Sequence, residues 1–115
     1  MKKIFLLLLT LVLLGCNQQE AGVYLFSFFK GNGEDGLHLA ASRDGFSWEA
    51  LNNNQSFLKP QVGKDKLMRD PCIIKGGDGK FHMVWTVSWN EKGIGYANST
   101  DLIHWSEQKY LPVME

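Results

Sequence analysis

The sequence predicts an all-β fold of the β-propeller type, built from repeated units of four antiparallel strands. The first observation behind this prediction is an internal repeat: shifted by 57 positions, residues 24–49 fall on residues 81–106 without a gap. The second is that both copies carry aromatic and β-branched runs separated by Gly- and Asp-rich turns. A self-match at this period is typical of stacked units that cannot bury their own face alone. Six pairs are identical: Glu34/Glu91, Gly36/Gly93, Ala40/Ala97, Ser42/Ser99, Asp44/Asp101 and Trp48/Trp105.

An apolar run precedes the first copy and predicts export of the protein. The chain starts with Met1-Lys2-Lys3, continues as an apolar run and reaches Leu13-Leu14-Gly15-Cys16. The run is too short for a mature membrane span and favours a signal peptide over residues 1–15. Its end resembles the bacterial lipobox, which implies a lipid thioether on Cys16, a polar tether over residues 16–22 and a cell-envelope location. An ordinary secretory signal with an incidental Cys16 is the alternative.

The remaining composition excludes several classes of function. Without residues 1–15 the chain has 12 acidic and 10 basic side chains, a net charge near −2. It therefore lacks the excess of positive charge that is typical of proteins that bind nucleic acid. We therefore expect membrane contact through the lipid anchor only. Cys72 lies in an apolar run and is expected to be a small core residue. The three histidines share no metal-ligand spacing, so we expect no metal site and no cofactor; a structural calcium ion is left open.

Each strand of the second copy can be read from the sequence. We expect strands at 71–75, 80–87 and 93–98, a hairpin turn at 76–79, a turn at 99–101 and a fourth strand from Trp105 onward. Four antiparallel strands of this kind make one propeller blade. The first copy shows the same pattern but lacks the first strand. Its strands are expected at 23–29 and 36–41, with a turn at 42–45. Trp48 and Trp105 are expected to be equivalent core positions.

These ranges define a propeller domain over residues 23–115, with a partial blade at 23–58 and a second blade at 69–115. The counterpart of the first strand of the second blade would fall on residues 13–18, within the signal peptide and tether. We therefore expect a strand from the C-terminus of a longer chain to complete the partial blade. A propeller needs about four blades at least, so this chain, which covers about two, is expected to be the N-terminal part of a larger domain.

A candidate site follows from tracing the strands. Arg69-Asp70-Pro71 precedes the first strand of the second blade, and the loop at 88–91 returns to the same end. Propeller sites form where such loops converge around the axis. We therefore expect Asp70 to be a site carboxylate. Trp89 and Asn90 are expected to contact the ligand, with the face of the Trp89 ring available for stacking. Arg69 could bind a hydroxyl or a carboxylate, or pair with Asp70.

The second copy resembles glycoside hydrolase family 43 and its relatives. The resemblance rests on Arg69-Asp70-Pro71, on the strand that follows Asp78-Gly79-Lys80, and on the turn Ser99-Thr100-Asp101-Leu102 with its Trp105. It implies a five-bladed propeller that hydrolyses arabinose- or xylose-containing oligo- or polysaccharides with inversion. It also implies that Asp70 is the general base. The acid would come from later blades, so these residues alone would be inactive.

Three alternatives remain open. Asp70 could be a structural turn residue. The domain could be a surface glycan-binding lipoprotein that lacks the acid. It could also be a sialidase-like propeller, because residues 42–48 approach the Asp-box pattern of that class but are one residue short.

Overall fold

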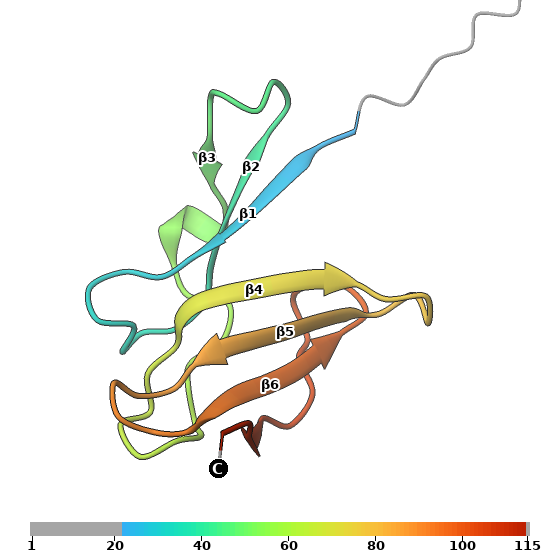
Figure 1. Ribbon diagram of the computed structural model, residues 1–115. Helices are drawn as coiled ribbons and strands as arrows, with labels where there is room; N and C mark the ends of the chain where they lie inside the picture. The colour runs from blue at the N-terminus through green and yellow to red at the C-terminus, as the bar shows by residue number, and fades with distance from the viewer. Residues whose placement is uncertain (1–21, 115) are drawn as a thin grey trace, which may run out of the picture.

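The computed structural model describes residues 22–114, which form two antiparallel β-sheets with a single short 3₁₀ turn (Figure 1). The prediction of an all-β fold is confirmed. The elements are β1 (Tyr24–Phe28), β2 (His38–Ser42), β3 (Glu49–Ala50), the 3₁₀ turn η1 (Asn52–Asn54), β4 (Arg69–Lys75), β5 (Phe81–Thr86), β6 (Gly93–Ser99) and β7 (Lys109–Pro112).

The second sheet has four strands in the order β4-β5-β6-β7, which is the up-and-down order predicted for one unit. In the β4–β5 hairpin Lys75 pairs with Phe81 around the Gly-rich turn, and in the β5–β6 hairpin Thr86 pairs with Ile94. The first three strands lie within two residues of their predicted bounds. The fourth begins later than predicted, because Trp105 makes only an isolated bridge with Ser99 before β7 starts at Lys109.

The first sheet has three strands in the order β1-β2-β3, and within residues 22–114 no strand pairs with the free edge of β1. Tyr24 pairs with Ser42 and Phe28 with His38. The same offset of 57 relates β1 to β5 and β2 to β6, so β1 is the second strand of its unit, as predicted. Residues 13–18, the expected counterpart of β4, lie outside the described residues.

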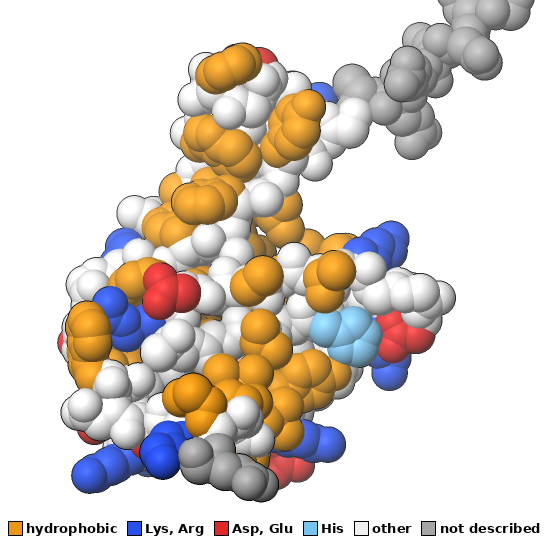
Figure 2. Space-filling model, viewed as in Figure 1, with side chains coloured by type: hydrophobic (Ala, Val, Ile, Leu, Met, Phe, Trp, Pro, Cys, Tyr) orange, Lys and Arg blue, Asp and Glu red, His pale blue; other side chains and the backbone are white. Residues whose placement is uncertain are grey.

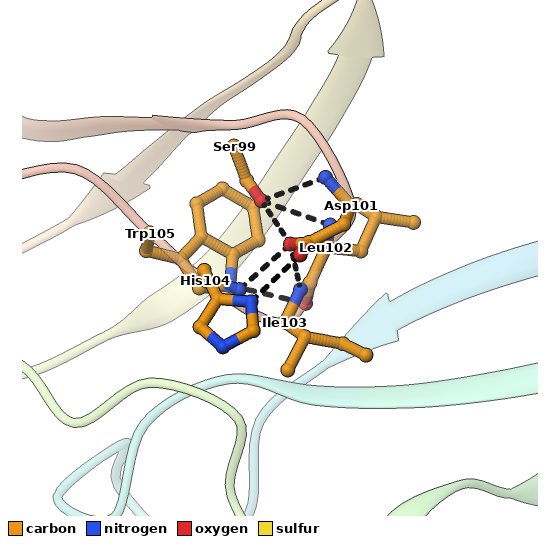
Figure 3. A network of polar contacts seen from close by, with 6 residues as sticks. All are labelled: Ser99, Asp101, Leu102, Ile103, His104 and Trp105. Atoms are coloured by element: carbon orange, nitrogen blue, oxygen red, sulfur yellow. Dashed lines mark hydrogen bonds and ion pairs between the residues drawn. The ribbon is translucent and has the colours of Figure 1, made fainter.

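The two Ser-x-Asp turns share one hydrogen-bond pattern, so the identical serines and aspartates of the repeat also have equivalent structural roles. Asp101 Oδ1 accepts the backbone N–H of Ile103 at 2.9 Å and of His104 at 2.7 Å (Figure 3). Asp44 Oδ1 accepts the N–H of Phe46 and of Ser47, both at 2.8 Å. The serine at the start of each turn also donates its hydroxyl to the aspartate two positions later. Both aspartates are therefore structural turn residues.

The two sheets share one apolar core. Its fully buried members come from β2, β5 and β6 and from residues next to β2, β4 and β5: Leu37, Leu39, Met68, Met83, Trp85, Val87 and Ala97. Leu37 and Leu39 of the first unit thus cover the inner face of the second sheet. Direct contact between the sheets is also polar, because the Ser27 hydroxyl donates to the Pro71 carbonyl oxygen at 2.6 Å.

The outer face of the first sheet corresponds, by the repeat, to the inner face of the second sheet. Within residues 22–114 no other element covers this face of the first sheet. Phe26, Phe28, Ala40 and Trp48 line a hollow of about 400 Å³ there. Shifted by 57, these four positions are Met83, Trp85, Ala97 and Trp105, of which the first three are buried. Trp105 is half-buried against the core, whereas Trp48 is 44 % exposed. The prediction that Trp48 is a core residue is therefore wrong for the described residues.

Apolar side chains also gather on the outer face of the second sheet (Figure 2). Ile74 and Val84 are exposed there, and so is Cys72, which pairs with Val84 across the β4–β5 ladder. The expectation of a buried Cys72 is wrong, because this strand position faces away from the first unit.

No helix within residues 22–114 has the length and hydropathy to cross a membrane. The predicted leader over residues 1–15, the lipid site at Cys16 and nearly all of the tether lie outside the described residues.

Candidate functional site

The candidate site lies at one end of both sheets, where the loops at 29–36, 59–68 and 87–92 come together (on the left in Figure 1). Because β4 and β5 are antiparallel and Arg69 pairs with Thr86, the start of β4 adjoins the loop that follows β5. The turns at 76–79 and 99–101 lie at the other end of the sheet, since Lys75 and Ser99 both pair with Phe81. This arrangement is the one expected from tracing the strands.

Asp70 sits in a β-bulge at the start of β4. The ladder with β5 is regular from Cys72 to Lys75, but its register shifts between Arg69 and Cys72. Pro71 has no N–H to donate to the ladder, so a break is expected beside it. Asp70 adopts a φ of +47°, a conformation that non-glycine residues rarely take and that often marks a functional position.

The side chain of Asp70 is exposed and uncommitted. Among residues 22–114 no hydrogen-bond or ion-pair partner of its carboxylate is found, although several other aspartates of the chain are bound to backbone N–H groups. A structural cap would accept such bonds. The geometry therefore favours a carboxylate that is available to a ligand or a water molecule.

Arg69 is held by three residues of the two neighbouring loops. Its guanidinium carbon lies 3.8 Å from the centre of the Trp89 ring and 5.3 Å from the centre of the Phe29 ring. Asn32 Oδ1 accepts an N–H from Arg69 Nη1, and the same oxygen accepts the Trp89 indole N–H at 3.1 Å. We call Phe29, Asn32, Arg69 and Trp89 the arginine cluster. Its members come from both units, so it joins them beside Asp70.

The backbone fixes the position of this cluster through a close approach at Gly33. The N–H of Met68 donates to the Gly33 carbonyl oxygen at 2.9 Å, one residue before Arg69. A Cβ at Gly33 would lie 2.7 Å from the Met68 carbonyl oxygen, and Gly33 has a φ of +90°. Only glycine fits this position without strain. The loop that carries Asn32 is therefore locked against the start of β4.

Three other carboxylates of the loops serve the backbone or a hydroxyl. Glu34 accepts the N–H of Asn32 at 3.0 Å, and Glu91 accepts the N–H of Lys64 at 2.6 Å. Asp65 accepts the hydroxyl of Ser88. These contacts hold the loops in place, and they leave Asp70 as the carboxylate at this end whose oxygens have no partner among the described residues.

The site residues predicted from the sequence lie close together in the structure. Arg69 and Trp89 are in contact, Asp70 follows Arg69 directly, and the exposed Asn90 follows Trp89. Trp89 is 67 % exposed, but the Arg69 guanidinium covers part of one ring face. The predicted pairing of Arg69 with Asp70, one of three alternatives, is not observed within residues 22–114.

Sequence reasoning missed Phe29 and Asn32. A signal for Asn32 was present, since it is the repeat counterpart of Trp89 and must lie at the same end of its unit. The sequence did not show that two equivalent loops of adjacent units touch each other.

The opposite end of the sheets carries the carboxylates with the most perturbed pKa values. The backbone N–H groups of Ser47 and Phe46 lower the pKa of Asp44 to about 2. A hydrogen bond from the His104 side chain, with those of two backbone N–H groups, lowers the pKa of Asp101 well below its usual range. The N–H of Lys80 and the His82 ring lower the pKa of Asp78. Each shift arises from structural hydrogen bonds of a turn, so none of these marks a second reactive site.

Among residues 22–114, a hollow at the other end of the first sheet is the main alternative to this site. Among residues 22–114, no group of three His, Cys, Asp or Glu side chains is placed to hold a metal ion. A hollow of about 450 Å³ lies beside the turn after β2, at the other end of the first sheet, where Arg43 and Asp44 are exposed. It borders the open apolar face. Glu49 in its lining is also an exposed carboxylate without a hydrogen-bond partner among the described residues, but it lies in a regularly paired strand and not in a bulge.

Comparison with known families gives one result. Residues 19–115 match the model of a family related to glycosyl hydrolase family 43 and described as a probable glycosyl hydrolase domain. The match includes both units and every residue of the candidate site. No curated protein and no solved structure matched the chain.

Proposed function

Since the chain belongs to the family of probable glycosyl hydrolase domains related to family 43, we propose that it forms part of a glycosidase that cleaves arabinose- or xylose-containing glycans with inversion. The observation that carries the proposal is the carboxylate of Asp70, which is exposed, without a partner among residues 22–114, and held in a bulge beside an arginine and an exposed tryptophan.

In this proposal Asp70 is the general base. Its carboxylate takes a proton from a water molecule, and the water oxygen attacks the anomeric carbon as the glycosidic C–O bond breaks. A second carboxyl group protonates the departing oxygen. The two groups must be roughly 6.5–9.5 Å apart to leave room for the water. Trp89 and Asn90 form one wall of the sugar site, and the acid is supplied by a later unit of the domain.

We further propose that the two units belong to a five-bladed ring. The support is the open face of the first sheet, whose residues are repeat counterparts of residues that the neighbouring unit buries in the second sheet. A further unit with side chains like Leu37 and Leu39 would cover it in the same way. A strand added to the free edge of β1 would complete the four-stranded order.

The cellular location belongs to the same proposal. The apolar run and Leu13-Leu14-Gly15-Cys16 support a lipid anchor that holds the enzyme in the cell envelope, where it meets polysaccharide.

The stereochemical outcome tests the function. The complete protein should be incubated with 4-nitrophenyl arabinosides and xylosides, and the first-formed anomer of the released sugar identified by proton NMR before mutarotation. Inversion is expected. Retention would contradict the base role of Asp70. Binding of these sugars without hydrolysis would favour the glycan-binding alternative, and cleavage of sialosides alone would favour the sialidase-like one.

A further inference from the structure

The arginine cluster places a positive charge next to Asp70, and no carboxylate of the described residues forms an ion pair with it. Arg69 forms no ion pair within residues 22–114, where the ion pairs involve one lysine and three histidines. The nearby Glu34, Asp65 and Glu91 are bound to backbone N–H groups or a hydroxyl. Proteins usually pair a half-buried guanidinium with a carboxylate or a phosphate.

The guanidinium is also held in a fixed orientation. Its plane is positioned by the Trp89 ring at 3.8 Å and by the Phe29 ring at 5.3 Å, and one N–H is donated to Asn32. An arginine has five N–H donors, so several remain for a ligand. Cation–π contacts with two rings stabilise the charge without using these donors. The cluster therefore presents a planar, preorganised donor edge, which is the arrangement that recognises a carboxylate through two parallel hydrogen bonds.

We propose that Arg69 binds the carboxylate of a uronic acid residue, so that the preferred substrate is an acidic glycan. This inference rests on the proposed function, since it takes the arginine cluster as part of a sugar site. Asn32 acts as a positioning residue: its amide oxygen holds both the guanidinium and the indole N–H, and it is uncharged, so it leaves the charge of Arg69 available.

A purely structural role for Arg69 makes a different prediction. If Arg69 only joined the two units, its replacement would lower stability but would not alter the preference between acidic and neutral sugars. The ratio of the two affinities is therefore the informative quantity, because a general loss of folded protein lowers both in proportion.

Two probes of four sugar residues each separate these roles. One is neutral xylotetraose, and the other is xylotriose that carries one 4-O-methylglucuronic acid. Their affinities for the complete protein should be measured by calorimetry at 20 and 200 mM salt. We expect the acidic probe to bind at least about tenfold more tightly at low salt, and the preference to shrink at high salt as the charges are screened.

Three variants complete the test. Arg69→Met removes the charge, and Asn32→Asp places a carboxylate against Arg69 at nearly unchanged size. Both should reduce the ratio of the affinities to about one. Arg43→Met is the matched control: Arg43 is the other arginine of the chain, is exposed at the opposite end of the first sheet, and should leave the ratio unchanged. Melting temperatures identify a variant that fails to fold. If Arg69→Met fails to fold, Asn32→Asp still tests the proposal.

Equal binding of the two probes by the unmodified protein, or binding of neither, would overturn the uronic acid proposal. A preference for the acidic probe that remains in both the Arg69→Met and the Asn32→Asp variants would also overturn it. Hydrolysis of the aryl glycosides is measured separately. Activity without acid preference refutes this inference alone, and acid preference without activity refutes the hydrolase proposal while the carboxylate site stands.

Discussion

Gly95 of β6 gives the sharpest prediction about the packing beneath the site. A Cβ at this position would lie 2.0 Å from Cε2 and 2.4 Å from Cζ2 of Trp85, its partner across the β5–β6 ladder. Ordinary contacts begin at about 3.4 Å. The indole would have to move by about 1.5 Å, yet Trp85 is 2 % exposed and packed within the shared core.

We therefore expect Gly95→Ala to lower the free energy of unfolding by about 2–3 kcal/mol, near the upper end of the range for overpacked cores. Urea denaturation of the complete protein measures this loss. Gly77→Ala is the control, because a Cβ there meets nothing within 4 Å, and it should change stability by less than about 1 kcal/mol. In a Trp85→Leu background the cost of Gly95→Ala should shrink by at least about 1 kcal/mol, since the two residues are in contact. Equal effects of the two glycine substitutions would refute the packing described here.

Further predictions concern the anchor, the turns and the open face. Cys16→Ser should abolish labelling of the protein by radioactive palmitate, and labelling that persists would exclude the anchor. Asp44 and Asp101 have lowered pKa values in the folded state, so their contribution to stability is present above their ordinary value of 3.8 and is lost as the pH falls toward about 2. Melting temperatures between pH 2 and 5 should therefore fall less steeply in Asp101→Asn than in the unmodified protein; an unchanged slope would contradict this. Trp48→Ala should cost about as much as Trp105→Ala, roughly 3–5 kcal/mol in urea denaturation of the complete protein. A cost below about 1 kcal/mol for Trp48 would mean that this face of the first sheet stays exposed and that no further propeller unit covers it.

The repeat made much of the fold predictable. An offset read from six identities located equivalent strands and placed the two Ser-x-Asp turns, in which four hydrogen bonds join equivalent atoms. It could not predict the exposure of Trp48, because the sequence of one unit does not show whether a neighbour covers it. The prediction for Cys72 failed for a related reason. The side chains of a strand point to both faces of the sheet, and Cys72 lies on the face that does not contact the first unit.

The site was predictable in its position but not in its contacts. Strand tracing brought Asp70 and Trp89 to one end, because antiparallel neighbours must alternate in direction. The contact of Asn32 with Arg69 and Trp89 depends on the close approach of Gly33 to Met68. This approach connects loops 35 residues apart and has no local sequence signal. The bulge at Asp70 was not predicted either. Pro71 lacks a backbone N–H, however, so a break in the strand ladder is expected beside it.

The turnover of Asp70→Asn on an aryl arabinoside or xyloside tests the central claim most directly. Asparagine keeps the size of the side chain but cannot take a proton from water, so the rate should fall on the order of 10²–10⁴-fold. Because the carboxylate is exposed and has no partner among the described residues, the melting temperature and the affinity for sugar should change little. The control is Asp101→Asn, which should lower stability and leave turnover per folded molecule nearly intact. An Asp70→Asn protein that retained most of its turnover would show that Asp70 is not the general base.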